Sequence, residues 1–258
     1  MDGRGFARGP VGAAVLPVAG LALAVAAWWA ATAAFPVNHA LVPTPGDVLA
    51  AFLQLPGYLL AQSLHTLAEV LEGFAVAVVV GALIAPALVG SPVVERMLFP
   101  LLLALNAVPK VAVAPLLVLW FGFGPAPKVV MVFLVCFFPV VISMVTGLAT
   151  TPPEFLELAR SLEAPRWRTF LKVRVPAALP QVFVGLKVAM TLAVIGAVIS
   201  EFQAGTSAGL GFVITTSTGQ SDTAQTFAAV ALLAIASIAL FYAIVAIERL
   251  LVPWAGKS

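Results

Sequence analysis

The sequence predicts an all-α membrane protein that crosses the bilayer six times, and three observations lead to this fold class. Of its 258 residues, 62% are hydrophobic and only 9% are charged, whereas about a quarter of a soluble domain is charged. The apolar residues form long blocks, and a bilayer core about 30 Å thick needs roughly 20 apolar residues per helix. Lysine and arginine gather in alternate joints between these blocks. We therefore predict one polytopic helical domain over residues 1–258.

Six apolar blocks are long enough to form spans. They cover residues 11–34, 63–89, 97–121, 128–149, 178–200 and 224–250. The first block follows Arg4 and Arg8, as the apolar core of a secretory signal follows its charged start. However, it runs for 25 residues from Val11 to Phe35 without a charge, which is long enough to cross the bilayer. We interpret it as an uncleaved first span.

The third block is unusual because Pro100, Pro109 and Pro115 lie in or near it. Each proline removes a backbone donor and kinks a helix. A broken backbone at membrane depth must be buried in protein or line a water-filled cavity. The block is therefore expected to form either kinked packing or the wall of a path.

The distribution of basic residues predicts the orientation of the chain, because cytoplasmic loops are enriched in lysine and arginine. With the N-terminus inside, the inner segments hold ten of the thirteen basic residues. The outer loops 35–62 and 201–223 hold none, and the third joint holds only Lys128. Both termini are therefore expected to be cytoplasmic.

In the first outer loop, Thr44 or Asp47 can cap a short helix that lies along the membrane surface.

The composition disfavours two classes of function. The net charge is only +2 and the basic residues are dispersed, which argues against nucleic-acid binding. The single cysteine, Cys136, allows neither an intrachain disulfide nor a cysteine zinc site, and we interpret it as a small buried side chain. At the C-terminus, Gly256-Lys257-Ser258 lacks the earlier glycine of a phosphate-binding loop. The chain is therefore not expected to bind ATP in this way.

Three polar residues share one face of the second span, and they invite a metal-site hypothesis. His65, Glu69 and Glu72 occur at i, i+4 and i+7, but three ligands on one helix rarely complete a metal site. We expect a polar stripe with a contact between His65 and Glu69, and no metal.

An intramembrane serine protease is also disfavoured, because both histidines, His39 and His65, precede Ser207 and none follows it.

The one strongly polar internal segment covers residues 152–176, within a predicted cytoplasmic loop at 150–176. It holds three acidic and five basic residues. Pro152 and Pro153 can open a helix at its first turn, and Pro165 disfavours helix at the residue before it. Apolar residues at i, i+3, i+4 and i+7 give this helix one apolar stripe, made of Phe155, Leu158, Ala159 and Leu162. Such a helix either binds in a groove of another protein or rests on the lipid surface.

The spacing of this segment resembles the EAA loop of binding-protein-dependent ABC import permeases. The pattern of that loop is Glu-Ala-Ala, three residues, Gly, nine residues, Ile, one residue, Leu-Pro. The corresponding residues here are Glu157, Leu158, Ala159, Glu163, Val173, Val175 and Pro176. The clear departure is Glu163 in place of glycine. Glycine allows a left-handed backbone at a helix end, and another residue there costs roughly 1 kcal/mol. Either the turn is made differently here, or Glu163 contacts a basic residue of the ATPase.

The resemblance covers residues from about 41 to 251 and is closest to the nitrate, sulfonate and taurine branch, which includes permeases for thiamine-precursor pyrimidines. The stretches 41–49, 109–124 and 208–212 also look like that branch. The resemblance implies a type I ABC importer permease fold in the bacterial inner membrane. It implies a second copy of the permease, two ATPase subunits that bind ATP and Mg, and a periplasmic or lipid-anchored substrate-binding protein. The chain itself is expected to be no enzyme and to hold no cofactor.

The resemblance also implies which residues couple the permease to its ATPase. Residues 157–164 would form a coupling helix that lies in a cleft of the ATPase. The expected coupling residues are Glu157, Leu158, Ala159, Ser161, Leu162, Glu163, Ala164, Arg166 and Pro176. The solute would be an organic or inorganic anion, such as sulfonate, taurine or nitrate, or a pyrimidine precursor.

Polar residues within the spans are candidates for the substrate path, because ionisable groups in a membrane are costly. These candidates are Asn106, Lys110, Lys187 and Glu201. A cavity lined by Asn106, Lys110 and Lys187 would favour an anion. Alternatively, Lys110 extends to an interface, or Lys187 pairs with a carboxylate. The rival function is a self-sufficient secondary carrier, but such carriers usually show internal repeats with matching broken helices, and the sequence shows none.

Overall fold

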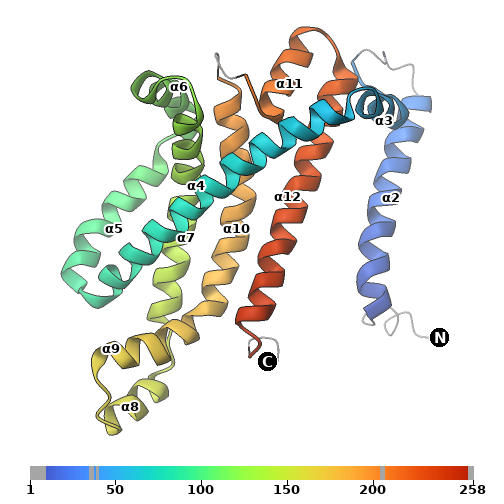
Figure 1. Cartoon of the computed structure of the whole chain (residues 1–258). Helices are drawn as coiled ribbons and strands as arrows, with labels where there is room; N and C mark the ends of the chain where they lie inside the picture. Colours follow the sequence, from blue (N-terminus) through green and yellow to red (C-terminus); the bar gives the residue numbers. More distant parts are fainter. Residues whose placement is uncertain (1–9, 35–37, 39–40, 204–206, 255–258) are drawn as a thin grey trace. The chain divides into compact units, whose positions relative to one another are not determined.

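The computed structural model describes residues 10–34, 38, 41–203 and 207–254, and helices make up nearly all of this part of the chain (Figure 1). The helices are α2 (Pro10–Ala34), α3 (Pro45–Gln54), α4 (Pro56–Gly90), α5 (Pro92–Ala107), α6 (Lys110–Phe121), α7 (Pro125–Ala149), α8 (Pro153–Ser161), α9 (Arg166–Thr169), α10 (Val175–Glu201), α11 (Leu210–Gly219) and α12 (Thr223–Leu251). A π-helical turn, Phe170–Arg174, joins α9 to α10. The all-α prediction is confirmed for the described residues.

Four helical stretches in the described part of the chain are long and apolar enough to cross a membrane. They are Pro56–Gly90, Pro125–Ala149, Arg166–Glu201 and Thr223–Leu251. The pair α5 and α6 makes a fifth candidate if the two helices count as one broken span. The predicted first span corresponds to α2, in which Val18–Ala34 forms a shorter apolar helix.

The predicted third span consists of two helices that are bent by 94° at their junction (Figure 1). Proline disfavours helical backbone at the preceding residue, and Val108 before Pro109 is accordingly extended, with ψ 127°. Pro100 and Pro115 stay inside α5 and α6. Only one of the three prolines therefore breaks the helix.

Several helix boundaries differ from the sequence-based expectation, with the largest shift at the start of α4, and one helix was not predicted. Helix α4 begins at Pro56, seven residues before the predicted start at 63, because proline fits the first turn of a helix. Helix α11 occupies part of the predicted outer loop 201–223. It was missed because its second half, Thr215 to Gly219, consists of residues with weak helix propensity.

The chain divides into two compact units, the first made of residues 1–59 and 213–231 and the second of residues 60–212 and 232–258. In the first unit, Thr44 caps α3 and forms a reciprocal capping box with Asp47, which confirms the predicted short helix. The rings of Trp28 and Phe227 also lie 5.8 Å apart within this unit.

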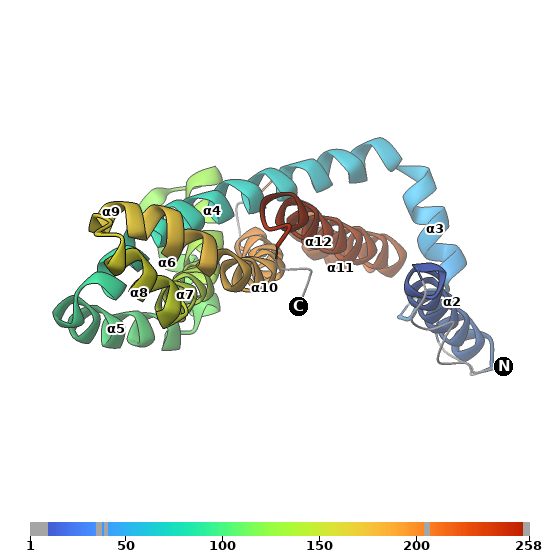
Figure 2. The same cartoon turned by 90° about the horizontal axis from the view of Figure 1, so that it is seen from below.

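The core of the second unit lies between α4, α7 and α10, and α7 and α10 run side by side in both views (Figures 1 and 2). Small residues allow this close approach, as in other membrane helix pairs. Between α7 and α10, a Cβ on Gly147 would lie 2.8 Å from the carbonyl oxygen of Ala178. Between α4 and α7, a Cβ on Gly73 would lie 2.8 Å from the carbonyl oxygen of Val129. Cys136 is fully buried in the same core, as predicted.

Candidate functional site

The loop helix α8 ends in a left-handed turn at Glu163. The backbone N–H of Ala164 donates to Ala159 O at 3.0 Å, and that of Glu163 donates to Arg160 O at 2.9 Å. This pair of bonds is the Schellman motif, whose penultimate residue is left-handed and usually glycine. Glu163 takes that conformation with φ 52°. The expectation that the turn is made differently here is therefore wrong, because the turn is kept although its side chain is not glycine.

The apolar stripe of α8 remains largely uncovered. Phe155, Leu158 and Leu162 are 53%, 59% and 71% exposed, whereas Ala159 is buried. The three exposed side chains line a groove of about 520 Å³, whose far wall includes Pro176 and Trp254. Burying large apolar side chains is favourable by roughly 1.5–3 kcal/mol each. The stripe is therefore suited to bind another surface.

The basic half of the loop continues the helical path rather than forming an extended strand. Arg166 begins α9, and the π-helical turn carries the chain directly into α10. Arg160, Arg166 and Arg174 line a second pocket beside Glu163, with a volume of about 810 Å³. Most of the predicted coupling residues thus line an apolar groove or a basic pocket, whereas Glu157 and Ser161 line neither. In α8 itself, Ser161 donates to the backbone oxygen of Glu157 at 3.1 Å.

At the other end of α10, an ion pair is buried between α4 and α7. Lys128 Nζ lies 2.6 Å from Glu69 Oε1, and the two side chains are 8% and 10% exposed. Lys128 also donates to the backbone oxygen of Ala208 at 3.0 Å. The second oxygen of Glu69, Oε2, is buried and receives no hydrogen bond from the described residues. Ionisable groups inside a membrane are costly unless they are paired, so this arrangement is a functional candidate.

Glu201 anchors the segment that follows α10. Its Oε1 accepts a hydrogen bond from Thr66 Oγ1 at 2.7 Å, and its Oε2 accepts one from Gly211 N at 2.6 Å. A Cβ on Gly209, which has φ 110°, would collide with this carboxylate. Glycine at this position is therefore required both by the backbone and by the close approach of Glu201. The Glu201 and Glu69 carboxyl groups lie close enough to interact.

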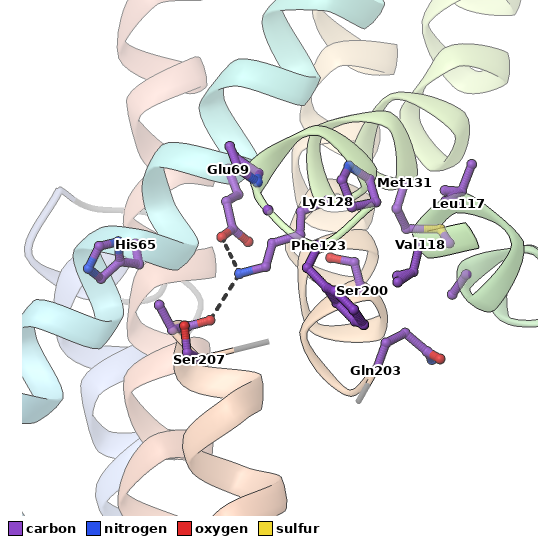
Figure 3. Close-up of a pocket in the computed structure, with 15 residues that line it drawn as sticks. His65, Glu69, Leu117, Val118, Phe123, Lys128, Met131, Ser200, Gln203 and Ser207 are labelled. Carbon is purple, nitrogen blue, oxygen red and sulfur yellow. Dashed lines mark hydrogen bonds and ion pairs between the residues drawn. The ribbon is translucent and has the colours of Figure 1, made fainter. Parts of the chain in front are cut away.

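A pocket of about 330 Å³ opens beside this polar cluster (Figure 3). Its polar wall includes Glu69, Lys128 and Gln203, and Figure 3 shows Lys128 reaching toward Glu69. Phe123 and Met131 belong to its apolar wall. A ligand pocket of this kind combines apolar walls with a few convergent polar groups.

The four predicted path residues lie at three separate places. Lys110 donates to the backbone oxygen and to the side-chain oxygen of Asn106, the latter at 2.9 Å, and both residues line a mainly apolar pocket of about 380 Å³. Lys187 forms an ion pair with Glu248 at 2.9 Å. The expectation that Lys187 pairs with a carboxylate is therefore confirmed. Glu201 belongs to the buried cluster with Thr66.

Sequence reasoning missed Lys128, which it counted only as a loop residue. A charge count would have indicated it, because Glu69 and Glu201 end up in spans and need a nearby cation. Glu69 forms its ion pair with Lys128, and His65 lies close enough to interact electrostatically with the same carboxyl group. Among the described residues, no three histidine, cysteine or acidic side chains are grouped to hold a metal ion.

Comparison with known proteins agrees with this arrangement. Residues 77–257 match the family described as binding-protein-dependent transport system inner membrane component. The chain is 34% identical over 219 residues to the formylaminopyrimidine transport permease protein of Halalkalibacterium halodurans, covering 84% of this chain and 87% of that protein. It is 37% identical over 216 residues to the riboflavin transport system permease protein of Chloroflexus aurantiacus, covering 83% and 80%.

A more distant relative falls in the branch that the sequence predicted. The taurine transport system permease protein of Escherichia coli is 29% identical over 249 residues, covering 94% of this chain and 90% of that protein. These relatives are permease subunits rather than enzymes, and the matching family is one of the bacterial inner membrane. The chain therefore belongs to the family of binding-protein-dependent ABC transport permeases.

Proposed function

We propose that this chain is the membrane subunit of an ATP-driven importer and that α8 is the helix on which a separate ATPase docks. The observation that supports this most directly is the uncovered apolar stripe of α8, held at its end by the Schellman turn at Glu163. A helix with an exposed apolar face is a common ligand for a groove in another protein. Family membership favours the groove over the lipid surface.

The proposed topology has six spans with both termini in the cytoplasm. It adds α2 to the four long helices and the bent pair α5 and α6. The basic residues of the 152–176 segment then face the cytoplasm, in agreement with the enrichment of lysine and arginine on that side. The buried cluster around Glu201 then lies near the outer surface.

The proposed assembly contains two copies of this chain, two ATPase subunits and one substrate-binding protein outside the membrane. ATP and Mg bind the ATPase subunits and not this chain. Closure of the ATPase dimer moves the coupling helices and opens the path outward, and hydrolysis returns it inward. The two-state element is the packing between the permease copies, biased by nucleotide on one side and by the loaded binding protein on the other.

The proposed solute is small and polar, either an organic or inorganic anion or a pyrimidine precursor. Asn106, Lys110, Lys187 and Glu201 remain the proposed path residues, although Glu248 neutralises the charge of Lys187. The relatives named for formylaminopyrimidine and riboflavin share 34% and 37% identity, against 29% for the taurine permease. This order favours a nitrogen heterocycle.

The docking role can be tested by the double variant Leu158→Ser with Leu162→Ser. Both side chains are exposed, so the variant should fold and insert normally while losing the apolar contact with the ATPase. The measurement is the ATP hydrolysis that co-purifies with tagged permease from its own membranes, together with solute uptake. We expect both to fall at least tenfold, because two buried leucines contribute roughly 1.5–3 kcal/mol each.

The matched control is Leu53→Ser, which removes a similarly exposed leucine from α3 and should leave both measurements unchanged. A second variant, Glu157→Lys, should also abolish uptake without loss of protein from the membrane. Undiminished ATP hydrolysis with the double variant would refute the docking role. Uptake by the permease alone in proteoliposomes, without any ATPase, would instead support a secondary carrier.

A further inference from the structure

The pocket beside Glu69 and Lys128 presents one acceptor and one donor whose hydrogen-bonding capacity is not filled. An ammonium group has three N–H donors, and Lys128 uses two of them on Glu69 and Ala208. Glu69 Oε2 lacks a donor within the described part of the chain, although a buried carboxylate oxygen normally has one. Both residues line the pocket (Figure 3).

A solute in the pocket can reach the carboxylate without breaking the ion pair. Glu69 Oε2 is covered in this structure, but the terminal torsion of a glutamate is broad and roughly two-fold. A small rotation turns one oxygen toward the pocket while the other keeps Lys128. An N–H or O–H donor would supply the hydrogen bond that this oxygen lacks. An acceptor would take the remaining N–H of Lys128.

The charges around the pocket disfavour a simple anion. Glu69 already pairs with Lys128 at 2.6 Å, and Glu201 lies close to the same carboxyl. An oxyanion such as nitrate would therefore meet a lysine that is already paired with an acidic side chain, and nitrate has no donor of its own to offer Glu69. Like charges that are brought together in a poorly solvated site repel strongly.

The remaining walls suit a flat, weakly polar ring. Phe123 is 73% exposed and lines the pocket together with Leu117 and Met131. Aromatic rings stack favourably on one another. The volume of about 330 Å³ lies at the lower end of the range for small-ligand sites, which limits the solute to one or two rings.

We propose that this pocket is a recognition site on the import path and that it selects an uncharged nitrogen heterocycle with a donor next to an acceptor. An amino group on the ring donates to Glu69, the neighbouring ring nitrogen or carbonyl accepts from Lys128, and the ring packs on Phe123. This inference rests on the proposed importer function and narrows its solute to the heterocyclic class. It excludes nitrate and simple alkanesulfonates, which carry no N–H or O–H donor, as ligands of this pocket.

The test is direct binding to the full-length permease in lipid nanodiscs, without an ATPase. Radiolabelled cytosine and 4-aminopyrimidine carry the required donor and acceptor side by side, and they serve as probes in equilibrium dialysis. We expect saturable binding that excess nitrate or methanesulfonate does not displace. Glu69→Gln should weaken it about tenfold, because a hydrogen bond to a charged acceptor is lost. Phe123→Ala should weaken it about fivefold.

The matched control is Phe121→Ala, which removes an exposed aromatic ring that lies two residues before Phe123 and does not line this pocket. It should bind the probes as the native chain does. Phe123 has no hydrogen bond to lose in its side chain, so Phe123→Ala keeps the test decisive even where Glu69→Gln impairs folding. No saturable binding of either probe, equal displacement by methanesulfonate, or native-like binding by Phe123→Ala would each overturn the assignment.

This binding assay is independent of the ATPase-docking experiment. If the docking prediction fails and the probes bind as expected, the proposed coupling role of α8 is wrong. If docking succeeds and probe binding fails, the importer stands and the assignment of this pocket is wrong.

Discussion

At the scale of single residues, Glu163 carries a backbone strain that its position in the loop imposes. Its φ of 52° is the left-handed conformation that glycine adopts without a steric penalty. We expect Glu163→Gly to raise the free energy of unfolding by about 1 kcal/mol, because the penalty of the Cβ disappears. The measurement is the midpoint of thermal unfolding of the purified permease in detergent.

The control for this prediction is Glu163→Ala, which removes the carboxylate but keeps the Cβ. It should not be stabilised, because its backbone strain is unchanged. Glu163 also lies beside Arg160, Arg166 and Arg174 in the basic pocket. An equal gain in stability from alanine and glycine would show that the side chain, and not the backbone, is the source of the penalty.

The sequence allowed Glu163 to be singled out but not Lys128, and the difference has a physical cause. Glu163 belongs to a local motif whose spacing along the chain determines the turn. Lys128 acquires its role from Glu69, which is 59 residues away, and from Ala208, which is 80 residues away. Contacts over such separations depend on how the helices pack, which a single sequence does not reveal.

At the scale of helices, Lys187 and Glu248 join α10 to α12 through a partly buried ion pair. Lys187→Met leaves Glu248 without its cation in an apolar setting, and we expect a loss of stability on the order of 2 kcal/mol. The double variant with Glu248→Gln should recover most of this loss, since no unpaired charge remains. The measurement is a double-mutant cycle of thermal unfolding midpoints.

A cycle in which the two single changes simply add would contradict a direct coupling between the helices.

The sequence predicted that Lys187 has a carboxylate partner but did not identify Glu248. It likewise predicted the cap of α3 at Thr44, because that cap is local. The 94° bend between α5 and α6 begins with the local effect of Pro109, but its size depends on packing around both helices.

At the scale of the whole molecule, the number of spans and the sides of the termini constrain each other. The described helices supply four spans, or five with the bent pair. Termini on the same side of the membrane require an even number of crossings. The proposed topology has both termini in the cytoplasm, as the distribution of lysine and arginine predicts. If the bent pair counts as one span, the proposed topology needs α2 to cross as well, although its fully described apolar part is shorter than an ordinary span.

Single-cysteine labelling in intact cells tests this topology. Cys136 is fully buried, so Cys136→Ser should remove the native thiol at little cost and provide a background without reactive cysteine. On that background, Ser221→Cys should react with a membrane-impermeant maleimide added outside the cell. Gly3→Cys and Ser161→Cys should react only after the membrane is permeabilised. Labelling of Gly3→Cys from outside, with Ser161→Cys protected, would contradict the proposed topology. It would mean that either α2 or the bent pair does not span, because together they would supply an odd number of crossings.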